Sequence, residues 1–286
     1  MENAAYRIET PAKVNIRLKV TGHRSDGYHE LVSVMVPVEL FDILEFTLHA
    51  DGPVKIISRG YEVPTDHTNL VSLAISLFMA RTGESAGVSV NLDKKIPVAS
   101  GLGGGSSDAA ATLLALNRIY SNPLLESDLM DMAVKLGADV PFFLDPRPSL
   151  ATGIGEILNP IESWPEYWYV IVIPPFRVST SWVYGNLKLE LTTGEYDYIV
   201  NALKNEPFTI SRILENDLEK VTSVRFPVIN TIKKLLKDAG AEGALMSGSG
   251  PSVFGVFLSP DKAKFAQKSL ISMDLGDVFM ARGGIP

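Results

Sequence analysis

Cysteine is absent from the 286-residue chain. Its absence excludes disulfide bonds, thiolate metal ligands and a cysteine nucleophile. A chain without cysteine suits a reducing compartment, and we expect a cytoplasmic protein. The four histidines do not form an HxxxH pattern, so we predict no structural metal site; they are His23, His29, His49 and His67.

A basic excess is missing as well. The chain has 26 Lys and Arg against 33 Asp and Glu, which gives a net charge of −7. Proteins that bind nucleic acid normally carry a Lys/Arg run or a basic excess, because they neutralise phosphates. The composition therefore predicts no nucleic-acid partner.

Long hydrophobic runs are also lacking. The most apolar stretch, YWYVIVIPPF (167–176), is too short to span a bilayer and contains two prolines. The first residues, MENAAYRIETPAK, do not show the basic-then-apolar pattern of a signal peptide. We therefore expect no membrane partner.

A strict alternation of apolar and polar residues over 12–20 predicts a half-buried strand. Its polar face consists of Lys13, Asn15, Arg17 and Lys19. On this pattern alone, solvent exposure is the favoured interpretation of that face.

The rest of the chain mixes strands and helices. Apolar segments predict strands at 31–38, 42–48, 54–58, 88–92 and 168–173, and two more around a glycine-serine turn within 242–257. Helical patterns occur at 69–80, 106–120, 128–136 and 227–240. The Pro- and Gly-rich segment 146–156 predicts a domain boundary, so we expect an α+β protein with domains 1–152 and 153–286.

The stretch VASGLGGGSSDAA (98–110) has glycine at four of the five positions from Gly101 to Gly105. Ordering so many glycines is costly, so the loop must gain something from its bare backbone. It lies between a strand and a helix N-terminus, where unpaired N–H groups attract anions, and this context favours a phosphate cradle. A flexible linker or a tight packing turn is the alternative. The GxxxxGK[ST], GxGxxG and GxSxG patterns are not present here.

Three blocks resemble the GHMP kinases in order: PAKVNIRLKVTG (11–22), PVASGLGGGSSDAA (97–110) and EGALMSGSGPSVFGVF (242–257). This resemblance implies an ATP-dependent small-molecule kinase with a two-domain GHMP kinase fold. Its N-terminal domain would be ribosomal-S5-domain-2-like and its C-terminal domain ferredoxin-like.

A particular branch of these kinases is similar in three further segments: GHRSDGYHEL (22–31), LGADVPFF (136–143) and GIGEILNP (153–160). That branch phosphorylates the 2-hydroxyl of a cytidine-diphosphate-linked methylerythritol in the non-mevalonate isoprenoid pathway. The segment DPRPSLAT (145–152) departs from the Gly- and Ala-rich sequence usual there, which affects the expected shape of the site edge.

The resemblance implies two catalytic residues. Asp139 would be the general base for the substrate hydroxyl, although its sequence context alone favours an N-cap for a helix begun by Pro141. Lys13 would stabilise charge on the transferred phosphoryl group and lower the pKa of Asp139 or of the hydroxyl.

The resemblance also implies binding residues. For the substrate, Tyr28 and His29 would hold the cytosine, Tyr184 would add a second stacking face, and Asn15 and Thr180 would complete the set. For ATP, the backbone of 97–107 would wrap the phosphates, with Ser106 and Ser107 near Mg²⁺. The implied cofactor-binding positions are Pro97, Val98, Ala99, Ser100, Gly101, Leu102, Gly103, Gly104, Gly105, Ser106, Ser107, Asp108, Asn69 and Lys94.

Two rival functions stay open at this point. Another GHMP kinase would act on mevalonate or homoserine, but those substrates carry no base for the DGYH turn to hold. A nucleotide-binding protein without catalysis would need neither Lys13 nor Asp139. The partners we expect are ATP, Mg²⁺ and a small-molecule substrate; the sequence does not decide the oligomeric state, and a homodimer is compatible with it.

Overall fold

The computed structural model describes residues 6–188, 194–204 and 208–284. Its internal contacts divide the chain into two compact units. Unit 1 holds the residues up to Ala12, Leu40–Val98 and Gly103–Pro146, and unit 2 holds Lys13–Glu39, Ala99–Leu102 and the chain from Arg147 onward. The division into consecutive domains 1–152 and 153–286 stays a prediction. Within these bounds, residues 1–5, 189–193, 205–207 and 285–286 lie outside the described ranges.

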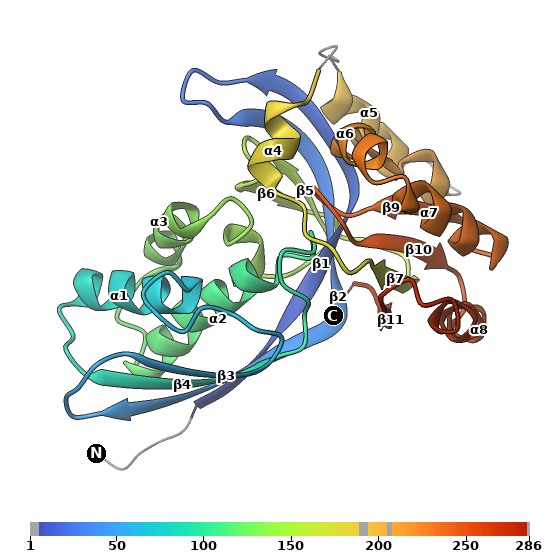
Figure 1. The fold of residues 1–286 in the computed structure, drawn as a ribbon. Coiled ribbons are helices and arrows are strands. Elements are labelled where there is room, and N and C mark those ends of the chain that lie inside the picture. The colour runs from blue at the N-terminus through green and yellow to red at the C-terminus, as the bar shows by residue number, and fades with distance from the viewer. Residues whose placement is uncertain (1–5, 189–193, 205–207, 285–286) are drawn as a thin grey trace. The chain divides into compact units, whose positions relative to one another are not determined.

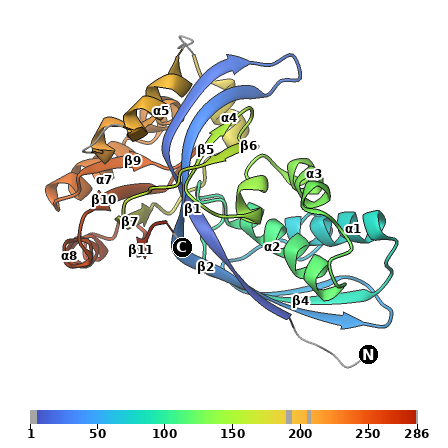
Figure 2. The same cartoon turned by 180° about the vertical axis from the view of Figure 1, so that it is seen from behind.

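Unit 1 consists of strands with helices over one face (Figures 1 and 2). In the sheet, β2 pairs antiparallel with β4, and β3 pairs parallel with β4. The helices α1, α2 and α3 and the short 3₁₀ helix η1 pack against one another. The elements are β1 (Tyr6–His23), β2 (His29–His49), β3 (Lys55–Gly60), α1 (Leu70–Thr82), β4 (Gly87–Lys94), α2 (Gly104–Ile119), α3 (Glu126–Leu136) and η1 (Pro141–Leu144); β1 and β2 continue into unit 2.

Unit 2 contains a four-stranded antiparallel sheet in the order β11-β7-β10-β9, with α7 and α8 packed against it. The chain order β7-α7-β9-β10-α8-β11 is the ferredoxin-like arrangement, so that expectation is confirmed. The sheet elements are β7 (Trp168–Ile173), α7 (Val228–Asp238), β9 (Gly243–Met246), β10 (Val253–Phe257), α8 (Pro260–Ile271) and β11 (Asp277–Arg282); the others are β5 (Ser149–Thr152), β6 (Ile157–Pro160), α4 (Thr180–Gly185), α5 (Glu195–Lys204), η2 (Ile210–Arg212), β8 (Glu215–Asn216) and α6 (Asp217–Arg225).

Several elements differ from the predicted ones. The two strands predicted at 31–38 and 42–48 form the single strand β2. The segment 146–156, expected to be a boundary loop, contains β5, which pairs with β2 and with β6. Pairing with strands that are distant in sequence creates β5, and the local Pro and Gly signals gave no indication of it.

The polar face of β1 is buried rather than exposed, which overturns the interpretation based on alternation alone. Its cations meet carboxylates of unit 2: Arg17 lies 2.6 Å from Glu195, and Lys19 lies 2.7 Å from Glu215 and 3.1 Å from Asp217. A strand that is covered on both faces can still alternate if its polar side is satisfied by ion pairs.

Among the described residues, no helix combines the length and apolarity needed to cross a membrane.

Candidate active site

The glycine loop is fastened to the first and third motifs within unit 2. The backbone N–H of Lys13 donates to the carbonyl of Leu102 at 2.9 Å. The hydroxyl of Ser247, in the turn between β9 and β10, donates to the carbonyl of Gly101 at 2.9 Å. The three sequence blocks that carried the family resemblance therefore meet at this loop.

Close packing explains one of the glycines. Gly101 has φ 84°, and a Cβ atom there would lie 2.2 Å from the carbonyl oxygen of Ser247. The loop is also held by a bond from Ser252 N–H to the Ser100 carbonyl at 3.1 Å. For Gly101, the alternative of a tight packing turn is thus correct. Ala99 adopts φ 54° without being glycine, which is the kind of backbone strain found at ligand sites.

The start of α2 is built differently. Helix α2 begins at Gly104, two residues earlier than predicted, because Gly103 takes the left-handed conformation as its N-cap. No side chain caps the helix, so the N–H groups of its first turn are left for another acceptor. Gly105 is exposed, and a Cβ there would meet only Leu70 at 3.5 Å. This part of the loop has the properties of an anion cradle.

The two serines of the loop are not equivalent. Ser107 is fully buried, and its hydroxyl donates to the carbonyl of Pro11 at 2.6 Å and also bonds with the Thr10 hydroxyl. Ser106, one residue earlier in the first turn of α2, is only half-buried. Of the two hydroxyls, that of Ser106 is the one available to a ligand.

Behind the cradle lies a buried cluster of charges in unit 1. Lys94, at the end of β4, pairs with Asp42 of β2 and with Asp108 of α2, the latter at 2.6 Å. Asp42 also accepts the backbone N–H groups of Lys95 and Ile96 at 2.6 and 2.8 Å. The cluster therefore ties two strands to the helix that carries the cradle.

Asp108 is the unusual member of this cluster. Burial raises the pKa of Asp108 to about 8; Lys94 opposes this increase and Asp42 adds to it. Its Oδ1 atom is buried without a hydrogen-bond partner. Sequence reasoning missed Asp42, whose only signal was a charged residue at the start of the apolar strand segment 42–48.

Asn69, predicted near the nucleotide, is the N-cap of α1. Its Oδ1 accepts from Val71 N–H at 2.9 Å and its amide donates to the Pro64 carbonyl at 2.6 Å. Asn69 and Lys94 both have structural partners, so their roles toward ATP stay predictions.

The ammonium group of Lys13 is oriented by a chain of hydrogen bonds in unit 2. Lys13 donates to Asn15 Oδ1 at 2.5 Å, and Asn15 Nδ2 donates to the Ser33 hydroxyl at 2.9 Å. Ser33 in turn donates to the Arg17 carbonyl at 2.7 Å, which fixes the direction of its hydroxyl. The backbone N–H of Asn15 donates to Ser247. Sequence reasoning found Lys13 and Asn15 but not Ser33.

The predicted cytosine residues also gather in unit 2. The rings of His29 and Tyr184 lie 4.9 Å apart with an interplanar angle of 31°, and Tyr28 is 57% exposed. His23 stacks edge-on against His29 at 4.8 Å. Burial and then the charge of His23 lower the pKa of His29, which keeps its imidazole neutral at pH 7. A neutral imidazole can both donate and accept at a base edge.

Thr180, at the start of α4, shares a hydrogen bond of 2.8 Å with the Ser249 hydroxyl. Ser249 belongs to the same glycine-serine turn as Ser247. This bond links α4, which carries Tyr184, to the third motif.

Asp139 lies half-buried in the turn between α3 and η1 of unit 1. The 3₁₀ helix begins at Pro141 with Val140 at its N-cap and without a side-chain cap. The N-cap alternative for Asp139 is therefore wrong. Because η1 packs against both α2 and α3, the turn that carries Asp139 is held by the helix that carries the cradle.

The residues present fit ATP. An uncapped helix N-terminus, an exposed glycine and a half-buried hydroxyl suit a phosphate chain. In the described ranges, no group of three or more His, Asp or Glu side chains is placed to hold a metal ion by itself. In proteins, Mg²⁺ commonly takes several of its oxygen ligands from the nucleotide and from water.

Comparison with known proteins places the chain in a class. Residues 69–145 match the model of the GHMP kinases N terminal domain, and residues 199–273 match that of the GHMP kinases C terminal domain. The chain belongs to the GHMP kinases, and its two-domain α+β fold is theirs.

Within the GHMP kinases, the chain is similar to enzymes of one particular name. The chain is 44% identical to 4-diphosphocytidyl-2-C-methyl-D-erythritol kinase of Syntrophotalea carbinolica, over 92% of this chain and 93% of the relative. It is 45% identical to the kinase of the same name from Geobacter metallireducens, with the same coverage. A solved structure of 4-(cytidine 5'-diphospho)-2C-methyl-D-erythritol kinase matches with a TM-score of 0.83 at 36% identity, over 98% of this chain and 100% of the other.

Proposed function

We propose that the protein is an ATP-dependent kinase that phosphorylates the 2-hydroxyl of 4-diphosphocytidyl-2-C-methyl-D-erythritol, within the non-mevalonate isoprenoid pathway. Relatives of that name at 44 and 45% identity over 92% of the chain support the reaction. The observation that supports the cytidine-linked substrate is the contact between the rings of His29 and Tyr184, next to the exposed Tyr28. We place the reaction in the cytoplasm, because a chain without cysteine suits a reducing compartment.

The aromatic residues bind the cytosine by stacking. The rings of His29 and Tyr184 touch each other, and the base stacks against this pair, with Tyr28 supplying a further face. The neutral His29 hydrogen-bonds to the base edge. Mevalonate and homoserine carry no ring for such a surface, which favours the cytidine substrate over these alternatives.

When bound, ATP supplies the γ-phosphoryl group that is transferred. The first-turn N–H groups of α2 would hold its phosphates, and the Ser106 hydroxyl would be a ligand of the accompanying Mg²⁺, which would neutralise charge on the phosphates. Asp139 accepts the proton of the substrate hydroxyl, and the hydroxyl oxygen forms a bond to the γ-phosphorus. The bond between this phosphorus and the β–γ bridging oxygen breaks, and the bridging oxygen leaves as part of ADP.

Lys13 stabilises the negative charge that develops during transfer. Asn15 holds the ammonium group through its Oδ1, and this amide is itself fixed by Ser33. An oriented ammonium needs no rearrangement when the charge appears, which is the source of its catalytic value.

The assay is release of ADP by the purified protein with ATP and Mg²⁺, measured in parallel with 4-diphosphocytidyl-2-C-methyl-D-erythritol, mevalonate and homoserine. Turnover with the first substrate alone is expected. Turnover with mevalonate or homoserine would refute the substrate assignment, and ATP binding without turnover on any of the three would refute catalysis.

Variants separate the roles. Asp139→Asn is expected to reduce kcat by about 10²–10⁴-fold, the usual contribution of a positioned base. Tyr184→Ala is expected to raise KM for the cytidine substrate, whereas Tyr196→Ala, a change of another exposed tyrosine in α5, is the matched control. A normal KM in Tyr184→Ala would remove that ring from the site.

A further inference from the structure

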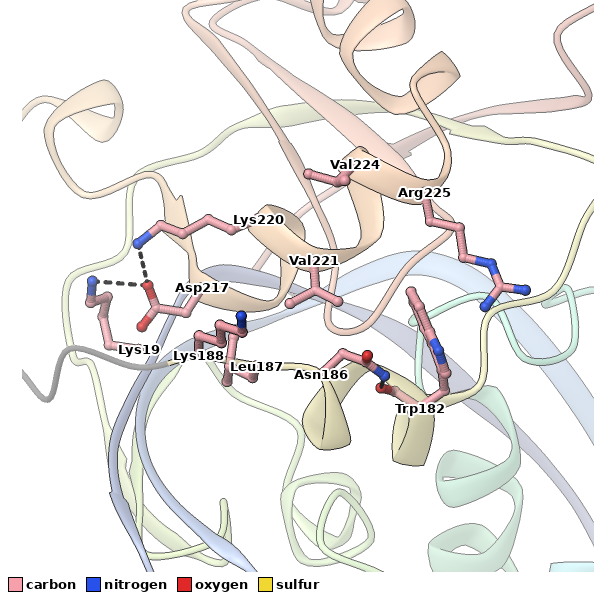
Figure 3. A pocket seen from close by; sticks show the side chains of 10 residues that line it. All are labelled: Lys19, Trp182, Asn186, Leu187, Lys188, Asp217, Lys220, Val221, Val224 and Arg225. Carbon is pink, nitrogen blue, oxygen red and sulfur yellow. Dashed lines mark hydrogen bonds and ion pairs between the residues drawn. The ribbon is translucent and has the colours of Figure 1, made fainter.

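Unit 2 contains a pocket of about 670 Å³ (Figure 3). One wall is α4 with the residues that follow it, and the opposite wall is α6. None of the predicted catalytic, nucleotide or substrate residues lines it. The volume is in the range of pockets that bind small organic molecules. Its lining residues are Lys19, Trp182, Asn186, Leu187, Lys188, Asp217, Lys220, Val221, Val224 and Arg225.

The pocket shares α4 with the cytosine residues but uses another side of that helix. Successive helical residues are rotated by about 100°, so side chains two positions apart point in nearly opposite directions. Trp182 therefore faces away from Tyr184. A molecule in this pocket would not occupy the surface that we assign to the base.

The charge of the pocket is opposite to that of the whole chain. Four cationic side chains and one carboxylate line it, in a protein with a net charge of −7. The carboxylate, Asp217, already accepts from Lys19 at 3.1 Å and from Lys220 at 2.8 Å (Figure 3). Arg225 takes part in none of the ion pairs found within the described ranges. The excess positive charge favours an anionic ligand.

The aromatic and apolar residues of the pocket indicate the chemistry of the uncharged part of such a ligand. The Arg225 guanidinium lies over the Trp182 ring, 4.5 Å from its centroid. A guanidinium held against an aromatic ring keeps its planar fork of donors oriented for the oxygens of a phosphate. Next to it, Leu187, Val221 and Val224 offer an apolar surface.

We propose that this pocket is a second ligand site, which binds a phosphorylated small molecule with an apolar or aromatic body. Arg225 contacts the phosphate, and the body lies along Trp182 and Val221. Binding here needs neither the transferred phosphoryl group nor the cytosine surface, so the proposal holds or fails independently of the kinase activity.

The test uses 1-naphthyl phosphate as the probe, titrated calorimetrically into the full-length protein. Saturating CDP and a non-hydrolysable ATP analogue are present throughout, because the probe could otherwise enter a nucleotide site. We expect one equivalent of probe to bind. Inorganic phosphate and 1-naphthol, each carrying half of the ligand, are expected to bind at least about tenfold more weakly, since each lacks one set of contacts.

Two variants locate the binding. Arg225→Gln removes the charge and the fork, and we expect it to weaken probe binding by about tenfold or more, as for the loss of a charged hydrogen bond. Arg118→Gln is the matched control, an exposed arginine at the end of α2 in unit 1. ADP release and the melting temperature of both variants are expected to equal those of the unchanged protein.

Four results would overturn the proposal. They are no binding under saturating nucleotides, equal binding of inorganic phosphate, unchanged binding in Arg225→Gln, and equal weakening in Arg118→Gln. If Arg225→Gln melts early, Val221→Trp provides the second test, because an indole inside the pocket excludes the probe without removing a charge.

Discussion

Replacing Asp108 with asparagine tests the buried charge cluster behind the phosphate cradle. In the folded protein the pKa of Asp108 is raised from 3.8 to about 8, with burial as the main cause. The unfolded chain releases this proton near pH 4, whereas the folded protein keeps it until about pH 8. The folded state therefore binds more protons in between, and its stability falls as the pH rises through this window.

The magnitude follows from linkage. One additional bound proton in the folded state changes the free energy of unfolding by about −1.4 kcal/mol for each pH unit. Between pH 5 and pH 7, Asp108 thus costs the protein up to about 3 kcal/mol, since two pH units are crossed. The pKa of Lys94 is raised above its ordinary value of 10.5, so Lys94 stays charged in this range and adds nothing to the slope.

The assay is urea unfolding of the unchanged protein and of Asp108→Asn at several values between pH 5 and pH 8. The difference in unfolding free energy is expected to shift in favour of the variant as the pH rises. Asp51→Asn, which changes an exposed carboxylate in the same unit, controls for the loss of one titratable group. A difference that stays constant from pH 5 to pH 7 would refute the raised pKa of Asp108 and the reasoning behind it.

Three further predictions concern the loop and its surroundings. Gly101→Ala is expected to lower the free energy of unfolding in urea by several kcal/mol, because a Cβ would meet the Ser247 carbonyl at 2.2 Å. Gly105→Ala is expected to leave stability unchanged while raising KM for ATP. Equal melting of the two variants would contradict the assignment of Gly101 to packing and Gly105 to phosphate binding. Ser33→Ala is expected to lower kcat about fivefold with little change in KM, because the Asn15 amide loses an acceptor worth about 1 kcal/mol. Recovery of kcat in Ser33→Thr would separate this loss from a packing effect. His29 is expected to titrate with a midpoint below its ordinary pKa of 6.5 in an NMR titration, so that any fall in kcat/KM for the cytidine substrate caused by its protonation also has its midpoint below pH 6.5. A His29 midpoint at or above pH 6.5 would contradict this.

Much of the local structure was predictable from periodicity. The alternation over 12–20, the buried run at 168–173 and the helical patterns at 69–80 and 128–136 are features of neighbouring residues, and β1, β7, α1 and α3 formed where expected. The interleaving of the two units was not predictable, because it arises from β1 and β2, each of which passes through both. A composition boundary along the chain cannot report such an arrangement.

The glycine loop illustrates the division most clearly. The amino-acid sequence of the loop predicts an unusual backbone and the start of a helix, and the three motifs indicate the family. They do not tell which glycine packs against Ser247 and which lies open, because this depends on a turn more than a hundred residues away.

The same holds for the polar residues. The sequence supplied Lys13, Asn15 and Asp139 as candidates through local motifs. Only the tertiary structure paired Asn15 with Ser247, 232 positions apart, and brought Asp42 to Lys94, 52 positions apart. Burial and partner identity set the charge state and orientation of these groups, and both are properties of the packed chain rather than of any stretch of it.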